Sequence, residues 1–132
     1  MAKVQSVARI VLGLIYFIFG GMGLAMALGL YHAAFPPLPP KAEAFMTGMM
    51  GSGYFFILLK MTETTCGFLL LTGIAVPLAL VIIASVTLNI YCFNLFLMPG
   101  LQNLLLPSVM VFCQITAMSA YWHKYRQLLA GR

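Results

Sequence analysis

The side chains most able to do chemistry surround one acid inside an apolar segment. Glu63 is one of only two acids in the chain, and Lys60 precedes it by three residues. Residues three apart share a helix face, so these two side chains can pair. A carboxylate in an apolar environment costs several kcal/mol unless it is paired, hydrogen-bonded, hydrated or protonated. Glu63 therefore indicates a binding site or a proton-exchange site.

Other polar or small residues are expected at about the depth of Glu63. Helices rise about 1.5 Å per residue, and counting along four predicted spans brings Asn89, Gln114 and the Gly20–Gly21 pair to one level near mid-membrane. The amides could hold a polar head group, and the glycines would leave room beside it. The alternative interpretation is that this layer only joins the helices through hydrogen bonds and close packing.

Two further residues complete the candidate site. Tyr16 lies one turn from the glycine pair, and its hydroxyl can hydrogen-bond inside a helix bundle. Asn94 lies nearer the outer end of the third predicted span, where it could line an entrance.

The composition indicates which solvent surrounds these residues. Hydrophobic residues make up 63% of the 132 residues and charged residues 7%, whereas soluble domains carry about a quarter charged residues. A soluble domain of this size could not bury so much apolar surface, so we expect the lipid bilayer as solvent. The net charge of +5 comes from a few basic residues, mostly near the ends. This pattern argues against a nucleic-acid partner, which would need a basic stripe.

Four segments are apolar and long enough to cross a bilayer, which takes about 20 residues. They are predicted at about 4–31, 54–73, 77–98 and 104–122. Gly73 is expected to end the second, and Pro77 suits the first turn of the third. The prediction is therefore an all-α, four-helix transmembrane bundle formed by a single domain over residues 1–132.

The segment 32–53 is expected to form the first outer loop. Its proline-rich part, Phe35 to Pro40, is unsuited to a helix interior and favours an extended connector. Lys41 to Met50 is predicted as a short amphipathic helix that lies flat at the membrane surface. His32 is interpreted as an interfacial residue and not as a metal ligand.

Four spans place both ends of the chain on the same side of the membrane. Basic residues occur near both ends: Lys3 and Arg9, then Lys124, Arg126 and Arg132. Because cytoplasmic segments carry an excess of basic residues, we expect both termini in the cytoplasm and the proline-rich loop outside.

The sequence contains no recognisable cofactor motif. Cys66, Cys92 and Cys113 form no CxxC pair and lie in apolar segments, so we interpret them as small apolar fillers. Phosphate loops, nucleophile elbows and zinc motifs are absent from the sequence. We therefore predict no metal site and no cofactor held by the chain itself.

Several short motifs, taken together and in order, resemble the DoxX family of small four-helix membrane proteins over most of the chain. Each motif is weak alone, and the combination is specific. The motifs are ARIVLGL at Ala8 to Leu14, PPLPP at Pro36 to Pro40, GYFFILLKMTE at Gly53 to Glu63, GFLLLTG at Gly67 to Gly73, VPLAL at Val76 to Leu80, and NIYCFNLFLMPG at Asn89 to Gly100.

This resemblance implies a multi-pass protein of the bacterial inner membrane with a respiratory or redox role. Similar proteins include a subunit of a thiosulfate:quinone oxidoreductase and part of a membrane-associated oxidoreductase complex. The chain departs from the family at Asn94, in a stretch where relatives often carry histidine, and at Ile74, where they often carry a basic residue. The missing histidine argues against haem or metal ligation here.

Three functional hypotheses follow. The first is a redox-associated subunit that binds a quinone or another apolar, lipid-like molecule around Glu63, with electrons supplied by a partner membrane or redox subunit. The second is a component of proton or small-solute transport in which Glu63 is the proton-coupled group. The third is a structural or assembly subunit without a ligand. The glycine-rich faces also favour a homodimer.

Overall fold

The computed structural model describes residues 2–30, 37–98 and 100–131. The described residues form helices and no strand, which confirms the predicted all-α fold. The elements in chain order are α1 (Ala2–Ala27), α2 (Pro40–Gly51), α3 (Phe55–Thr72), α4 (Val76–Phe96), the 3₁₀ helix η1 (Leu101–Leu104), α5 (Leu105–Ser119) and α6 (Trp122–Ala130).

Four of these stretches are long and apolar enough to cross a membrane: α1, α3, α4, and η1 continued by α5. The chain is therefore a multi-pass membrane protein built on four helices. The predicted boundaries in the centre of the chain are confirmed closely. Gly73 ends α3 in the left-handed region at φ 80°, and Pro77 lies in the first turn of α4.

The first span is shorter than predicted. Gly29 adopts φ 78°, and the Leu30 N–H donates to the carbonyl of Ala25 at 2.8 Å. Glycine takes this left-handed conformation without a steric penalty and lets the helix end cap itself. The helix therefore ends at Ala27, before the predicted end at residue 31. Residues 31–36, with His32 and the first prolines, lie outside the described part of the chain.

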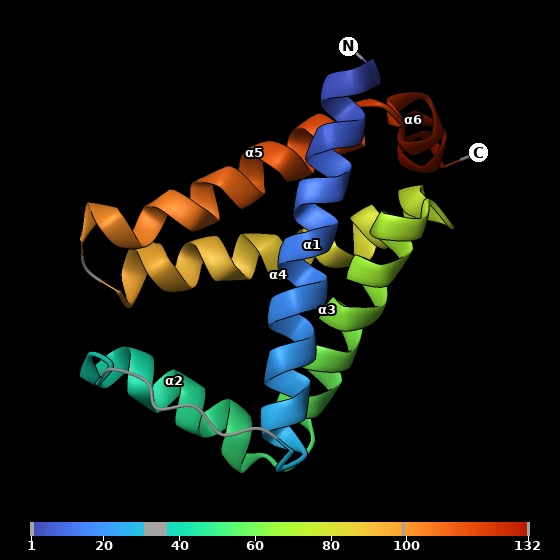
Figure 1. Cartoon of the computed structure of the whole chain (residues 1–132). Helices are drawn as coiled ribbons and strands as arrows, with labels where there is room; N and C mark the ends of the chain where they lie inside the picture. The colour runs from blue at the N-terminus through green and yellow to red at the C-terminus, as the bar shows by residue number, and fades with distance from the viewer. Residues whose placement is uncertain (1, 31–36, 99, 132) are drawn as a thin grey trace.

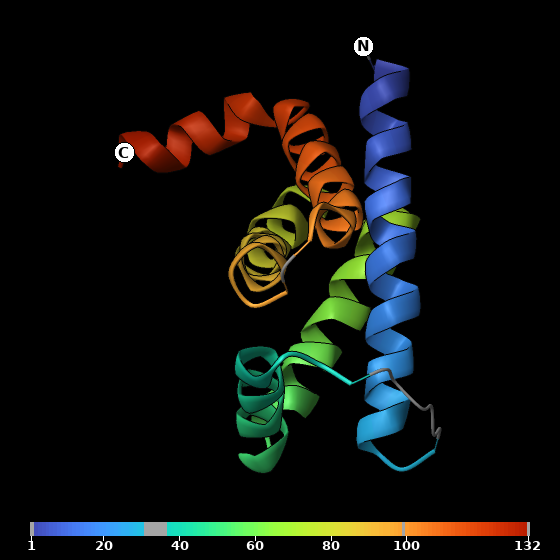
Figure 2. The same cartoon turned by 90° about the vertical axis from the view of Figure 1, so that its left-hand side faces the viewer.

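The four long helices form two pairs that cross steeply. α1 and α3 run antiparallel, and α4 and α5 form a second antiparallel pair that crosses α1 at a steep angle (Figures 1 and 2). α1 packs closely on α3 because glycines line their contact. A Cβ atom on Gly67 would lie 2.5 Å from the backbone nitrogen of Phe17. This approach of two backbones is the close packing that small residues permit in membrane helices.

The core lies where the two pairs meet. Leu12 and Tyr16 of α1, Leu70 of α3, and Leu80 and Ile83 of α4 are all at most 1% exposed. Most other large apolar side chains on the spans point outward, as expected for helices whose outer faces contact lipid tails.

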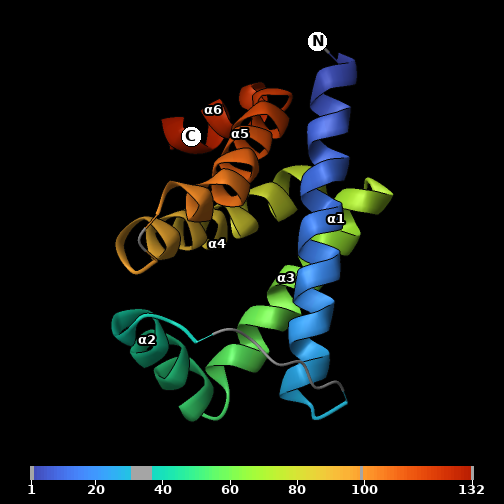
Figure 3. The ribbon, with the colours of Figure 1, turned by 60° about the vertical axis from the view of Figure 1, so that its left-hand side comes forward.

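The two short helices lie beside this core. α2 extends to the same side of the α1–α3 pair as α4 does (Figure 3), and Phe45 of α2 packs on Phe93 of α4 with ring centroids 5.4 Å apart. The predicted helix over residues 41–50 is confirmed within about one residue at each end. α6 was not predicted. The fourth span was expected to continue to about residue 122, but α5 stops at Ser119 and α6 begins at Trp122.

Candidate functional site

Lys60 and Glu63 form an ion pair on α3. The Lys60 Nζ lies 2.9 Å from Oε2 of Glu63, and the carboxylate side chain is only 5% exposed. The pairing expected from their spacing is therefore present. The Lys60 ammonium also lies 5.4 Å from the centre of the Phe56 ring, within range of a cation–π contact.

The carboxylate of Glu63 is incompletely satisfied. Its Oε2 is the single buried side-chain nitrogen or oxygen among the described residues that lacks a hydrogen-bond partner. Lys60 approaches this atom at ion-pair distance without hydrogen-bond geometry. Buried polar atoms are hydrogen-bonded in the great majority of cases. An exception at a membrane-embedded acid is a candidate ligand position.

Glycines of α1 lie directly against this pair. A Cβ atom on Gly20 would be 2.9 Å from the Cβ of Glu63 and from the backbone nitrogen of Thr64. One on Gly23 would be 2.6 Å from the aliphatic chain of Lys60. Gly20 thus admits the pair by close helix packing. Gly21 points elsewhere, with nothing within 4 Å of its Cβ position.

A half-open cavity of about 120 Å³ adjoins the ion pair, between α2, α3 and α4. We call it the Lys60–Glu63 cavity. Asn89 of α4 is its other polar side chain. The remaining walls are apolar, aromatic or thioether groups: Phe45, Met46, Met49, Phe56, Leu59, Val86, Ile90 and Phe93. The structure therefore brings Glu63, Lys60 and Asn89 to one cavity. The depth count had placed Glu63 and Asn89 at one level.

A second polar cluster joins α1, α4 and α5. The Tyr16 hydroxyl hydrogen-bonds Oγ1 of Thr87. Oγ1 of Thr87 also lies 3.0 Å from Oε1 of Gln114 and 3.0 Å from the carbonyl oxygen of Ile83, and its one proton is shared between these two acceptors. Because that proton is engaged, Tyr16 is the donor to Thr87. Gln114 in turn donates through Nε2 to the carbonyl of Leu80 at 2.8 Å. We call this chain the buried polar network.

The structure separates the predicted layer into these two groups. Tyr16 and Gln114 belong to the buried polar network, although Glu63 lies within electrostatic range of Tyr16. Asn94 belongs to neither group, because its amide donates to the carbonyl of Ile90 in its own helix at 2.8 Å. Thr87 was missed, since a threonine in an apolar helix usually bonds only its own backbone.

No metal centre is formed by the part of the chain that the structure describes. Within residues 2–30, 37–98 and 100–131, no group of three or more His, Cys, Asp or Glu residues could hold a metal ion. The three cysteines are free thiols, with Cys66 and Cys113 buried in the core. The polar chemistry available at the site is therefore that of the ion pair and the amide.

Comparison with protein-family models, curated proteins and solved structures found no match to this chain. The class of the protein therefore follows from the fold and the site alone. The described residues form a multi-pass, all-α membrane protein with four long helices and an ion-paired cavity beside α3.

Proposed function

We propose that the chain is a DoxX-type subunit of a bacterial inner membrane that binds the head group of a quinone or another apolar small molecule in the Lys60–Glu63 cavity. The single observation that carries the proposal is the Lys60–Glu63 ion pair, which together with Asn89 lines an otherwise apolar hollow. Ligand sites commonly combine apolar walls with a few convergent polar groups.

The cavity offers complementary groups to such a head group. Lys60 and the amide of Asn89 can donate hydrogen bonds to a quinone carbonyl, and Glu63 can accept one from a quinol hydroxyl. The enclosed volume is about 120 Å³ and the cavity is open on one side, so it would hold only the polar edge of a quinone ring. The apolar tail would remain outside, toward the lipid. Glu63 would exchange a proton with the bound head group.

A redox role requires a partner. The described residues provide no cluster that would hold an electron-carrying metal, so electrons would pass from a partner membrane or redox subunit to the bound quinone. A homodimer is the other proposed assembly. Its support is Gly21, whose open surface would let a second helix approach closely.

Both termini are proposed to lie in the cytoplasm. The start of α1 and the helix α6 lie at the same end of the molecule, opposite α2 (Figure 1). The basic residues Lys3, Arg9, Lys124 and Arg126 belong to that end. An excess of basic residues marks the cytoplasmic side, and α2 with the proline-rich loop would then face outward.

The test is native mass spectrometry of the protein in mild detergent with short-chain ubiquinone and menaquinone added. The wild type should retain a quinone, and Glu63→Gln should lose most of this binding. The matched control is Glu43→Gln, the same change at the other acid of the chain, which is exposed on α2. Equal quinone retention in all three proteins would overturn the proposal.

The second candidate is proton or small-solute transport, favoured by the same incompletely satisfied carboxylate. Proteoliposomes loaded with a pH-sensitive dye distinguish the two. Transport through this site requires a proton flux that disappears in Glu63→Gln and persists in Glu43→Gln. If neither quinone binding nor flux depends on Glu63, the chain is best described as a structural or assembly subunit.

A further inference from the structure

The helix α6 is amphipathic, and its charged residues are basic. Trp122, Tyr125 and Leu129 recur at spacings of three and four residues and share one face. Lys124 and Arg126 are exposed on opposite flanks of this face, because residues two apart do not share a helix face. The two acids of the chain lie elsewhere, on α2 and α3. An amphipathic helix of this pattern is typical of a membrane interface.

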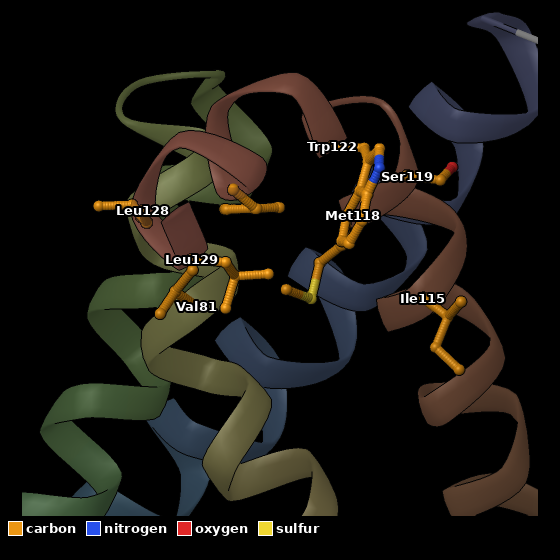
Figure 4. A pocket seen from close by; sticks show the side chains of 8 residues that line it. Val81, Ile115, Met118, Ser119, Trp122, Leu128 and Leu129 are labelled. Carbon is orange, nitrogen blue, oxygen red and sulfur yellow. The ribbon is translucent and has the colours of Figure 1, made fainter. Parts of the chain in front are cut away.

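The apolar face of α6 closes one side of a groove of about 500 Å³. Its walls come from α4, α5 and α6. Figure 4 shows Trp122 beside Met118 on one side of the hollow and Leu129 beside Val81 on the other. The walls are almost entirely apolar. The groove lies within the range of about 300–1,000 Å³ that is usual for ligand pockets.

A polar surface of α6 adjoins this groove. It is formed by α6 alone and carries His123, Arg126 and Gln127 beside Leu129. Leu129 also lines the groove, so an apolar space and a surface that carries the positive charge of Arg126 meet across one side chain. An apolar molecule alone would fill only the first space, and a free anion only the second. One molecule that combines an acyl chain with a negatively charged head group fits both.

α6 is also held in place. The Tyr125 hydroxyl donates to the carbonyl of Pro77, in the first turn of α4, at 2.8 Å. The side chain of Tyr125 is buried at 7% exposure. Trp122, the only tryptophan of the chain, marks the level of the membrane interface, where aromatic residues concentrate. The groove therefore opens where a lipid head group and its first acyl carbons would lie.

We propose that the groove between α4, α5 and α6 binds an anionic phospholipid, with one acyl chain against Val81, Met118 and Trp122 and the phosphate beside His123 and Arg126. Basic pockets at the cytoplasmic side of membrane helices are suited to anionic head groups. This site is separate from the Lys60–Glu63 cavity and does not depend on the ligand proposed there.

The position of Trp122 provides the measurement. The full-length protein is placed in vesicles of unlabelled phosphatidylcholine that contain either dibrominated phosphatidylglycerol or dibrominated phosphatidylcholine. Bromine on an acyl chain quenches tryptophan fluorescence on contact. The brominated anionic lipid should reach half-maximal quenching of Trp122 at about one fifth of the mole fraction that the brominated zwitterionic lipid requires.

Three variants identify the cause of this preference. Arg126→Gln should remove most of the preference, whereas Arg126→Lys, which keeps the charge, should retain it. Lys41→Gln, which removes one positive charge on the distant helix α2, should leave the preference unchanged. Equal quenching of the wild type by both lipids would overturn the proposal. A full preference in the Arg126→Gln protein would also overturn it, because the charge beside the groove would then not be its source.

The apolar half of the site is tested by filling it. Val81→Phe should reduce quenching by brominated phosphatidylglycerol, since less of the groove is open to an acyl chain. Helicity measured by circular dichroism provides the folding control for every variant. If Val81→Phe folds and quenching is unchanged, the acyl chain does not occupy the groove and the proposal fails.

Discussion

The buried polar network and the Lys60–Glu63 cavity both place polar side chains among apolar helices. They differ in how these side chains are paired. In the network, Tyr16, Thr87 and Gln114 donate to one another in sequence, and the last bond ends on a backbone carbonyl. In the cavity, the Lys60 ammonium lies 2.9 Å from Oε2 of Glu63, and both residues line open space together with Asn89.

This difference separates polar residues that hold helices together from those that remain available to a ligand. A closed network can contribute to stability and has no group left to recognise another molecule. An ion pair and an amide that line a cavity can still exchange hydrogen bonds with a ligand held there. Mutations should therefore affect the two regions differently.

The largest expected effect is the removal of one member of the ion pair. Lys60→Met leaves the Glu63 carboxylate buried without its cation and should lower the free energy of unfolding by about 3 kcal/mol. The measurement is reversible unfolding in mixed micelles of mild detergent and SDS. In the double variant Lys60→Met with Glu63→Leu, most of this loss should be recovered, because apolar residues often replace a buried pair at little cost. A double variant as unstable as the single one would contradict this view of the pair.

A smaller effect is expected from two adjacent glycines of α1. Gly20→Ala places a methyl group 2.9 Å from the backbone of Thr64, and it should cost about 2 kcal/mol because the helices must separate. Gly21→Ala meets nothing within 4 Å and should be neutral or slightly stabilising, since alanine favours helix. The same unfolding measurement compares them directly. The comparison is informative because the two positions differ by one residue, so equal effects would exclude close packing at Gly20 as the cause.

The smallest effect is expected in the buried polar network. Gln114→Leu removes the bonds to Thr87 and to the Leu80 carbonyl. Hydrogen bonds between membrane helices contribute about 0.6 kcal/mol each on average, so the loss of stability should be about 1 kcal/mol. Quinone retention, measured as for Glu63→Gln, should be unchanged. If a folded Gln114→Leu protein lost quinone binding, the buried polar network would also contribute to the binding site, and the two regions would not be independent.

The sequence was sufficient for most of the fold because helix length, glycine and proline are local signals. Gly73 and Pro77 mark a turn through conformational preferences of their own. α6 was missed for a related reason. The aromatic residues around its start, Tyr121, Trp122 and Tyr125, also suit the end of a membrane span, and no glycine or proline adjoins the break at Ala120.

The site was predictable only where contacts are local. Lys60 and Glu63 share a face because they are three residues apart on one helix. The depth count brought Gln114 and Glu63 to one level, but level alone does not decide which helix faces which. Because α4 crosses α1 steeply (Figure 2), Gln114 contacts Thr87, and Asn89 reaches the cavity. The crossing depends on side-chain packing among all four helices, which no single segment encodes.

Because Lys60 and Glu63 are close in sequence, their ion pair is expected to form before the buried polar network during synthesis of the chain. Chains are synthesised at about 5–20 residues per second, and Lys60 and Glu63 belong to one helix, so their pair is complete as soon as α3 forms. Tyr16 is 71 residues from Thr87, and Thr87 is 27 from Gln114. The network must therefore wait until α5 has been made. During biosynthesis Lys60 and Glu63 would therefore enter the bilayer as an ion pair. The hydrogen bonds of the neutral network would form last, when the fourth span packs against the other three.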